Sequence, residues 1–139
     1  LNPENQKALI NRGVLFTQTN NFKLAEVDLT KAVEINIKNP KALHNRGWLY
    51  LQMMQYDKSL KDLNKVIEIY PNRKHSYLTR GVAYAKLKKY DLAEKDFKHA
   101  LMLDSQYANA YMNLNYLYKE MGKDREAEQF LEKYKLYAK

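Results

Sequence analysis

The sequence contains no cysteine, only four glycines and three prolines, and no long hydrophobic run. The lack of cysteine excludes a disulfide scaffold, a thiolate nucleophile and a thiolate zinc site. With 45% hydrophobic and 29% charged residues, the composition is typical of a soluble helical domain and not of a disordered or collagen-like chain. No apolar run approaches the roughly 20 residues that a bilayer span requires, so no membrane insertion is expected.

Length and charge narrow the classes of protein further. A chain of 139 residues is typical of a single domain. A net charge of +8 makes acidic proteins, nucleic acid and anionic membranes worth weighing as partners. A chain without cysteine is compatible with both cytosol and periplasm, so the sequence leaves the compartment open, with the cytoplasm weakly favoured.

Three of the four glycines recur with a period of 34 residues, at Gly13, Gly47 and Gly81. Each follows an arginine and precedes an aromatic residue three positions later. Small residues recur in the same phase, at Ala25, Ser59, Ala93 and Ala127. The period defines four repeats, over residues 6–39, 40–73, 74–107 and 108–139.

Residues 1–5 precede the first repeat. Pro3 lies two full periods before Pro71, so this segment matches the tail of a preceding repeat. We therefore expect the chain to come from a longer array.

Apolar residues follow helical spacing in two stretches of each repeat, which predicts two helices per repeat. Polar or turn-forming residues separate the two stretches, for example at 19–21 and 88–89. Asp57, Asp91 and Asp124 follow these breaks and are predicted to cap the second helices.

This pattern resembles the tetratricopeptide repeat (TPR), a 34-residue helix–turn–helix unit with Gly, Tyr, Ala, Phe and Pro at fixed offsets. The resemblance covers residues 6–139, although repeat four has Asn115 at the glycine position and Tyr134 at the second alanine position. It implies an all-α fold, a right-handed TPR solenoid of antiparallel helix pairs forming a single TPR domain over residues 1–139. It also implies a non-catalytic scaffold that binds a peptide or helix of a partner protein in its concave groove.

Charged residues recur in register with the glycines. An aspartate follows each arginine by 16 residues, and in repeat four both positions are apolar, Leu114 and Phe130. This joint change favours structural ion pairs over a row of arginines that binds phosphate or carboxylate groups. The expected pairs are Arg12 with Asp28, Arg46 with Asp62, and Arg80 with Asp96.

The resemblance implies that the first helix of each repeat lines the groove. A polar side chain recurs there one residue before each arginine position, at Asn11, Asn45, Thr79 and Asn113. An amide both donates and accepts, so such a ladder can pair with the backbone of an extended peptide; the alternative is that these groups only solvate the groove.

Further residues are expected to line the groove near this ladder: Lys7, Lys41, His44, His75, Trp48 and Tyr116. The two lysines favour an acidic partner. Trp48 is interpreted as an anchor for the partner, against the alternative that it belongs to the core.

Other functions have less support. Of the five positions of the carboxylate clamp that holds chaperone C-termini, only Asn45 matches, so that class of partner is not expected. The basic charge is spread over all repeats, with one local cluster at Lys86, Lys88 and Lys89, which favours a solvated face over nucleic-acid binding. Self-association through exposed repeat ends is the main alternative to peptide binding.

Catalysis is not indicated by any residue pattern. His44, His75 and His99 lack the spacing of a metal site, and no glycine-rich phosphate loop or nucleophile–base arrangement is recognisable. We expect no enzymatic activity, no cofactor and no metal.

Overall fold

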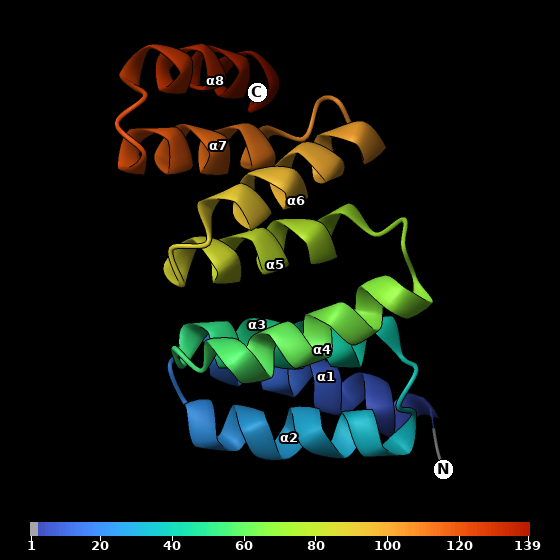
Figure 1. The fold of residues 1–139 in the computed structure, drawn as a ribbon. Coiled ribbons are helices and arrows are strands. Elements are labelled where there is room, and N and C mark those ends of the chain that lie inside the picture. Colours follow the sequence, from blue (N-terminus) through green and yellow to red (C-terminus); the bar gives the residue numbers. More distant parts are fainter. Residues whose placement is uncertain (1–2) are drawn as a thin grey trace. The chain divides into compact units, whose positions relative to one another are not determined.

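The computed structural model describes residues 3–139, and within them it contains eight α-helices and no strand (Figure 1). The helices are α1 (Pro3–Gln18), α2 (Phe22–Ile35), α3 (Pro40–Gln52), α4 (Tyr56–Ile69), α5 (Lys74–Lys86), α6 (Tyr90–Leu103), α7 (Ala108–Glu120) and α8 (Asp124–Tyr137). The expected all-α fold with two helices per repeat is confirmed. Leu1 and Asn2, assigned from the sequence to the tail of a preceding repeat, lie outside the described residues.

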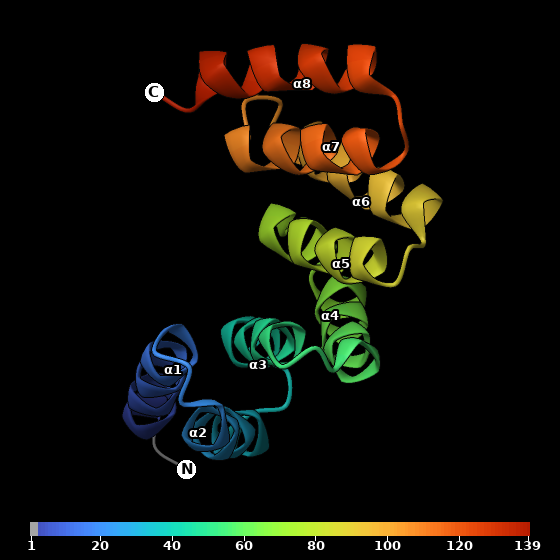
Figure 2. The ribbon, with the colours of Figure 1, turned by 90° about the vertical axis from the view of Figure 1, so that its left-hand side faces the viewer.

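Each repeat forms one helix pair, and the two helices of a pair run antiparallel, as α7 and α8 show in both views (Figures 1 and 2). Helices α3, α5 and α7 begin at the first residue of their repeats, whereas α1 begins earlier, at Pro3. The chain divides between Pro71 and Asn72 into two compact units. The first unit contains α1–α4, with α1 against α3; the second contains α5–α8, with α5 against α7.

The recurrent glycines allow the two helices of a repeat to approach closely. A Cβ atom on Gly13 would lie 2.6 Å from Cγ of Leu29, and one on Gly81 would lie 2.5 Å from Cε1 of Phe97. Leu29 and Phe97 are almost fully buried, so they have no space into which they can retreat. The period of 34 therefore marks the points of closest helix contact.

Repeat four replaces this close contact with a hydrogen bond. Asn115, at the glycine position, is 1% exposed, and its Nδ2 donates to the backbone oxygen of Ala127 at 2.7 Å. The bond ties α7 to α8 and satisfies a side-chain donor that would otherwise be buried without a partner. The departure from the repeat pattern is thus accommodated within the same helix pair.

Each unit has its own hydrophobic core. In the first unit, Leu43 and Val66 belong to one buried cluster, and Leu29 and Leu49 belong to another. In the second unit the central cluster is built around Phe97, Leu114 and Tyr118. Burial of these apolar side chains is the main term that stabilises each unit.

The turn inside every repeat contains one residue with left-handed backbone. These residues are Asn20 (φ 62°), Met54 (φ 59°), Lys88 (φ 61°) and Gly122 (φ 74°), each 34 positions after the previous one. Glycine and asparagine adopt this conformation at low cost, whereas Met and Lys are strained there. The turn geometry is thus constant although its sequence is not.

The predicted helix caps are wrong. The N-cap residues of α4, α6 and α8 are Gln55, Lys89 and Lys123, and none of their side chains caps its helix. The aspartates at 57, 91 and 124 lie inside the first turn of these helices. There a negative charge complements the helix dipole without closing a cap. By contrast, the Asn39 side chain does cap α3, accepting from the backbone N–H groups of Lys41 and Ala42.

Candidate functional site

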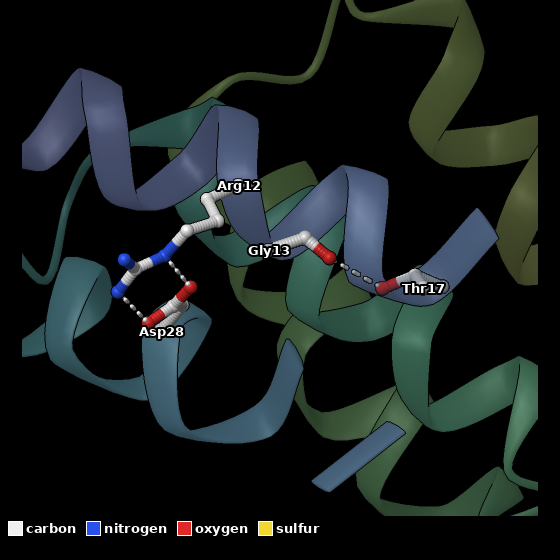
Figure 3. Close-up of polar contacts among 4 residues, drawn as sticks. All are labelled: Arg12, Gly13, Thr17 and Asp28. Atoms are coloured by element: carbon white, nitrogen blue, oxygen red, sulfur yellow. Dashed lines mark hydrogen bonds and ion pairs between the residues drawn. The ribbon is translucent and has the colours of Figure 1, made fainter. Parts of the chain in front are cut away.

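The arginines and aspartates of repeats one to three form bidentate ion pairs. In the first repeat, Nε and Nη2 of Arg12 donate to the Asp28 carboxylate at 2.7 and 2.9 Å (Figure 3). The pairs of Arg46 with Asp62 and of Arg80 with Asp96 have the same geometry, at 2.7–2.8 Å. Each pair joins the two helices of one repeat.

The carboxylates of these pairs are buried, whereas the arginine side chains differ in exposure, at 62% for Arg12, 19% for Arg46 and 20% for Arg80. Hydrogen bonding to the aspartate raises the pKa of Arg12, Arg46 and Arg80 above the ordinary arginine value. Each guanidinium also lies over an aromatic ring of the next helical turn: Phe16, Tyr50 and Tyr84 respectively. Because each arginine binds its own aspartate, a row of arginines open to an external anion is not present.

The polar ladder places two rungs in each unit. Asn45 and Asn113 occupy equivalent positions on α3 and α7, and each side-chain Nδ2 donates to a backbone oxygen four residues earlier, at 2.8 Å. Those acceptors are the carbonyls of Lys41 and Asn109. The bond fixes the amide and leaves its Oδ1 without a hydrogen-bond partner among the described residues, so the oxygen is available to an N–H group of a ligand.

The other two rungs behave differently. Asn11 on α1 is exposed, on the helix beside α3. Thr79 on α5 donates its hydroxyl to the backbone oxygen of His75 at 3.0 Å. A threonine hydroxyl engaged in this way presents a smaller polar group than an asparagine, so the ladder is chemically uneven in the second unit.

The cationic residues predicted beside the ladder are accessible. Lys7 and Lys41 are exposed, and His44 is half-buried. His75 is exposed on one side and stacks on Tyr107, with ring centroids 5.5 Å apart. Partial burial, followed by the nearby charges of Lys74 and Arg73, lowers the pKa of His75 below 6.5.

The two aromatic residues predicted for the groove occupy equivalent positions in the two units. Trp48 on α3 is half-buried, and Tyr116 on α7 is 58% exposed. Neither is part of the buried core of the described chain. Both therefore keep ring surface that a ligand can cover.

A pocket of about 540 Å³ lies in the second unit, between the C-terminal parts of α5 and α7. It joins Asn113 and Tyr116 from the predicted set to three lysines, Lys86, Lys88 and Lys119. The sequence pattern pointed to Lys86 and Lys88 as a local cluster on a solvated face, but it did not connect them with Lys119. The available signal was that Lys119 is one period after Ala85 and so occupies the same end of the next first helix.

The described residues contain no group of three or more His, Asp or Glu side chains arranged to hold a metal ion. Within the same part of the chain, no helix has the length and apolar character needed to cross a bilayer.

Comparison with known proteins identifies the repeats. Family models of the tetratricopeptide repeat match residues 6–39, 40–73 and 76–107. No curated protein matches the sequence.

Solved structures with the same fold are numerous. The crystal structure of TTC0263, a thermophilic TPR protein of Thermus thermophilus, has a TM-score of 0.89 at 17% identity, with 95% of this chain and 74% of that chain covered. PilF of Pseudomonas aeruginosa has a TM-score of 0.86 at 22% identity, covering 94% of this chain and 60% of that chain. MamA from Desulfovibrio magneticus RS-1 has a TM-score of 0.83 at 17% identity, covering 96% and 75%.

At these identities the structures establish the shared fold, while the matched repeats establish the family. The fold is that of a TPR solenoid, and the class of function that goes with it is protein interaction or assembly. The chain belongs to the tetratricopeptide repeat family.

Proposed function

We propose that this chain is a non-catalytic scaffold that binds an extended peptide segment of a partner protein along the first helices of its repeats. The observation that carries the proposal is the matched pair Asn45 and Asn113. In both units the amide is fixed to its own helix, with its oxygen directed to an outside donor. Such an acceptor pairs with the backbone N–H of a peptide whatever the peptide's side chains.

Aromatic and basic side chains supply the remaining parts of the binding surface. Trp48 and Tyr116 are each three residues after a ladder asparagine, so each lies about one helical turn from an amide. A partly exposed aromatic ring next to a polar anchor is the arrangement found at energetically important interface positions. Lys7 and Lys41 add positive charge, which favours an acidic segment.

A pull-down from native lysate at near-physiological salt tests this proposal. The wild type is compared with Asn45→Ala/Asn113→Ala, and recovered proteins and nucleic acid are both measured. We expect a discrete protein that the wild type retains and the variant loses. Asn64→Ala/Gln129→Ala, which removes two exposed amides from second helices, is the matched control and should retain it. Circular dichroism verifies that both variants are folded. Equal recovery by all three proteins would contradict the role of the ladder.

Self-association is the second candidate, and exposed apolar side chains on α2 support it. Leu24 and Val27 are three residues apart on one face of this helix, 53% and 52% exposed. Sedimentation at several concentrations, with Leu24→Gln/Val27→Gln as the comparison, tests this function. A wild type that remains monomeric throughout would exclude it, and nucleic-acid binding would instead appear as material that is released steeply by salt.

A further inference from the structure

The pocket between α5 and α7 has a strongly basic rim. Lys86 ends α5, Lys88 is in the turn that follows, and Lys119 is in the last turn of α7. All three are exposed, and none forms an ion pair with a described residue. Glu120 is the only acidic residue of the lining, so the rim keeps a positive excess.

The wall and floor of this pocket are apolar or aromatic. Val82 and Leu117 contribute aliphatic surface, and Tyr116 contributes a ring of which more than half is exposed. Asn113 adds one amide oxygen without a partner among the described residues. The pocket therefore offers an apolar contact and an acceptor for an N–H group inside a ring of cations.

The three lysines are not required by the repeat fold. In the first unit, the positions 68 residues earlier are held by Gln18, Asn20 and Leu51, none of which is charged. Lys88 also has left-handed backbone, at φ 61°, a conformation that asparagine or glycine adopts with less strain. Strained residues that the fold does not need are found preferentially at functional sites.

We infer that this pocket binds an acidic segment of a partner protein, in which an apolar side chain is flanked by aspartate or glutamate. The apolar side chain covers Val82, Leu117 and Tyr116, and the flanking carboxylates meet the three lysines. A peptide fits this lining better than a nucleic acid does, because Glu120 repels phosphate and the cations enclose one apolar pocket in place of a continuous basic stripe. The inference rests on the proposed function, since Asn113 and Tyr116 belong to both.

Chemical-shift mapping on the whole chain tests this inference. The 15N-labelled protein is titrated with a blocked pentapeptide of sequence Gly-Glu-Leu-Glu-Gly. Matched probes carry Gln-Leu-Gln or Lys-Leu-Lys at the centre. We expect the acidic probe to shift the resonances around Lys86, Asn113 and Lys119, the neutral probe to bind about tenfold more weakly, and the basic probe to leave them unchanged. A factor of ten corresponds to about a factor of two for each exposed charge pair.

Charge-removing variants locate the site. Lys86→Gln/Lys88→Gln/Lys119→Gln should weaken the acidic probe about tenfold, whereas Lys23→Gln/Lys31→Gln/Lys61→Gln, the same charge change on exposed positions of α2 and α4, should leave binding near the wild-type value. Lys88→Gly removes a rim charge and relieves backbone strain, so loss of binding in this variant cannot be attributed to unfolding.

Three results would overturn the inference. They are the absence of shifts at the pocket, equal affinity for the acidic and neutral probes, and larger shifts at the same residues with a short single-stranded oligonucleotide. If the pull-down still depends on Asn45 and Asn113 in any of these cases, the peptide scaffold stands and only the assignment of this pocket fails. If the probe binds the pocket and the pull-down does not depend on the asparagines, the ladder fails and the pocket stands.

Discussion

Arg46 and Asp62 form two hydrogen bonds, Nε to Oδ2 at 2.7 Å and Nη2 to Oδ1 at 2.8 Å, across the two helices of repeat two. The same two positions in repeat four are Leu114 and Phe130, which lie in one hydrophobic cluster with Tyr118. Phe130 packs edge-on against the Tyr118 ring, with centroids 4.9 Å apart. The site between the helices thus accepts either a matched ion pair or a matched apolar pair.

Arg46→Leu alone is expected to lower the free energy of unfolding by about 2–4 kcal/mol, because it leaves the Asp62 carboxylate buried without its cation. Adding Asp62→Phe should restore at least half of this loss by reproducing the pair of repeat four. Urea denaturation of the wild type, both single variants and the double variant measures the coupling. Strictly additive effects would show that the two residues do not act as a pair.

Gly81→Ala tests the close contact in repeat three. The new methyl group would lie 2.5 Å from Cε1 of Phe97, which is 1% exposed and cannot move aside. We expect a net loss of about 1–2 kcal/mol, because overpacking outweighs the gain of about 1 kcal/mol in helix propensity. Thermal unfolding provides the measurement. An increase in the melting temperature would mean that α5 and α6 separate at little cost.

The left-handed turn residues predict a graded series of stabilising substitutions. Met54→Gly and Lys88→Gly should each raise the free energy of unfolding by about 1 kcal/mol, since they relieve a φ near 60° in a residue with a side chain. Asn20→Gly should give a smaller gain, because asparagine tolerates this conformation. Equal effects at all three positions in denaturant titrations would argue against backbone strain as the cause.

Much of the fold could be predicted from periodicity, because the close contacts at Gly13, Gly47 and Gly81 must recur with the helix pair that they hold together. The antiparallel helix pairs and their boundaries follow from this. The helix caps could not be predicted in the same way, since an aspartate after a turn is compatible both with a cap and with the first helical turn. Asp91 occupies the first turn, where the dipole alone stabilises its charge.

The candidate site was less accessible to sequence reasoning. The positions of Asn45 and Asn113 follow from helix phase, but the bond that fixes each amide depends on its rotamer. The basic pocket depends on packing between helices, because Lys86 and Lys119 are 33 residues apart and meet only where α5 lies against α7. A lysine cluster read along the chain therefore resembles ordinary solvated surface.

The His75–Tyr107 stack predicts a pH-dependent contribution to stability. The pKa of His75 is lowered mainly by partial burial and further by Lys74 and Arg73, while Asp104, on the far side of Lys74, is engaged by that lysine. The folded chain therefore binds fewer protons at His75 than the unfolded chain. The contribution of neutral His75 is complete above its ordinary value of 6.5 and decreases as the pH falls through that value toward the lower folded pKa.

We expect an NMR titration of the imidazole protons to give a pKa for His75 below 6.5. Tyr107→Leu should move this pKa upward, because removing the ring returns water to the imidazole. Tyr107→Phe keeps the stacked ring and should leave the pKa near the wild-type value. In denaturation measured from about pH 8 to about pH 5, the wild type should lose more stability than His75→Gln. An identical pKa in the Leu and Phe variants would mean that Lys74 and Arg73, and not burial under Tyr107, determine the protonation of His75.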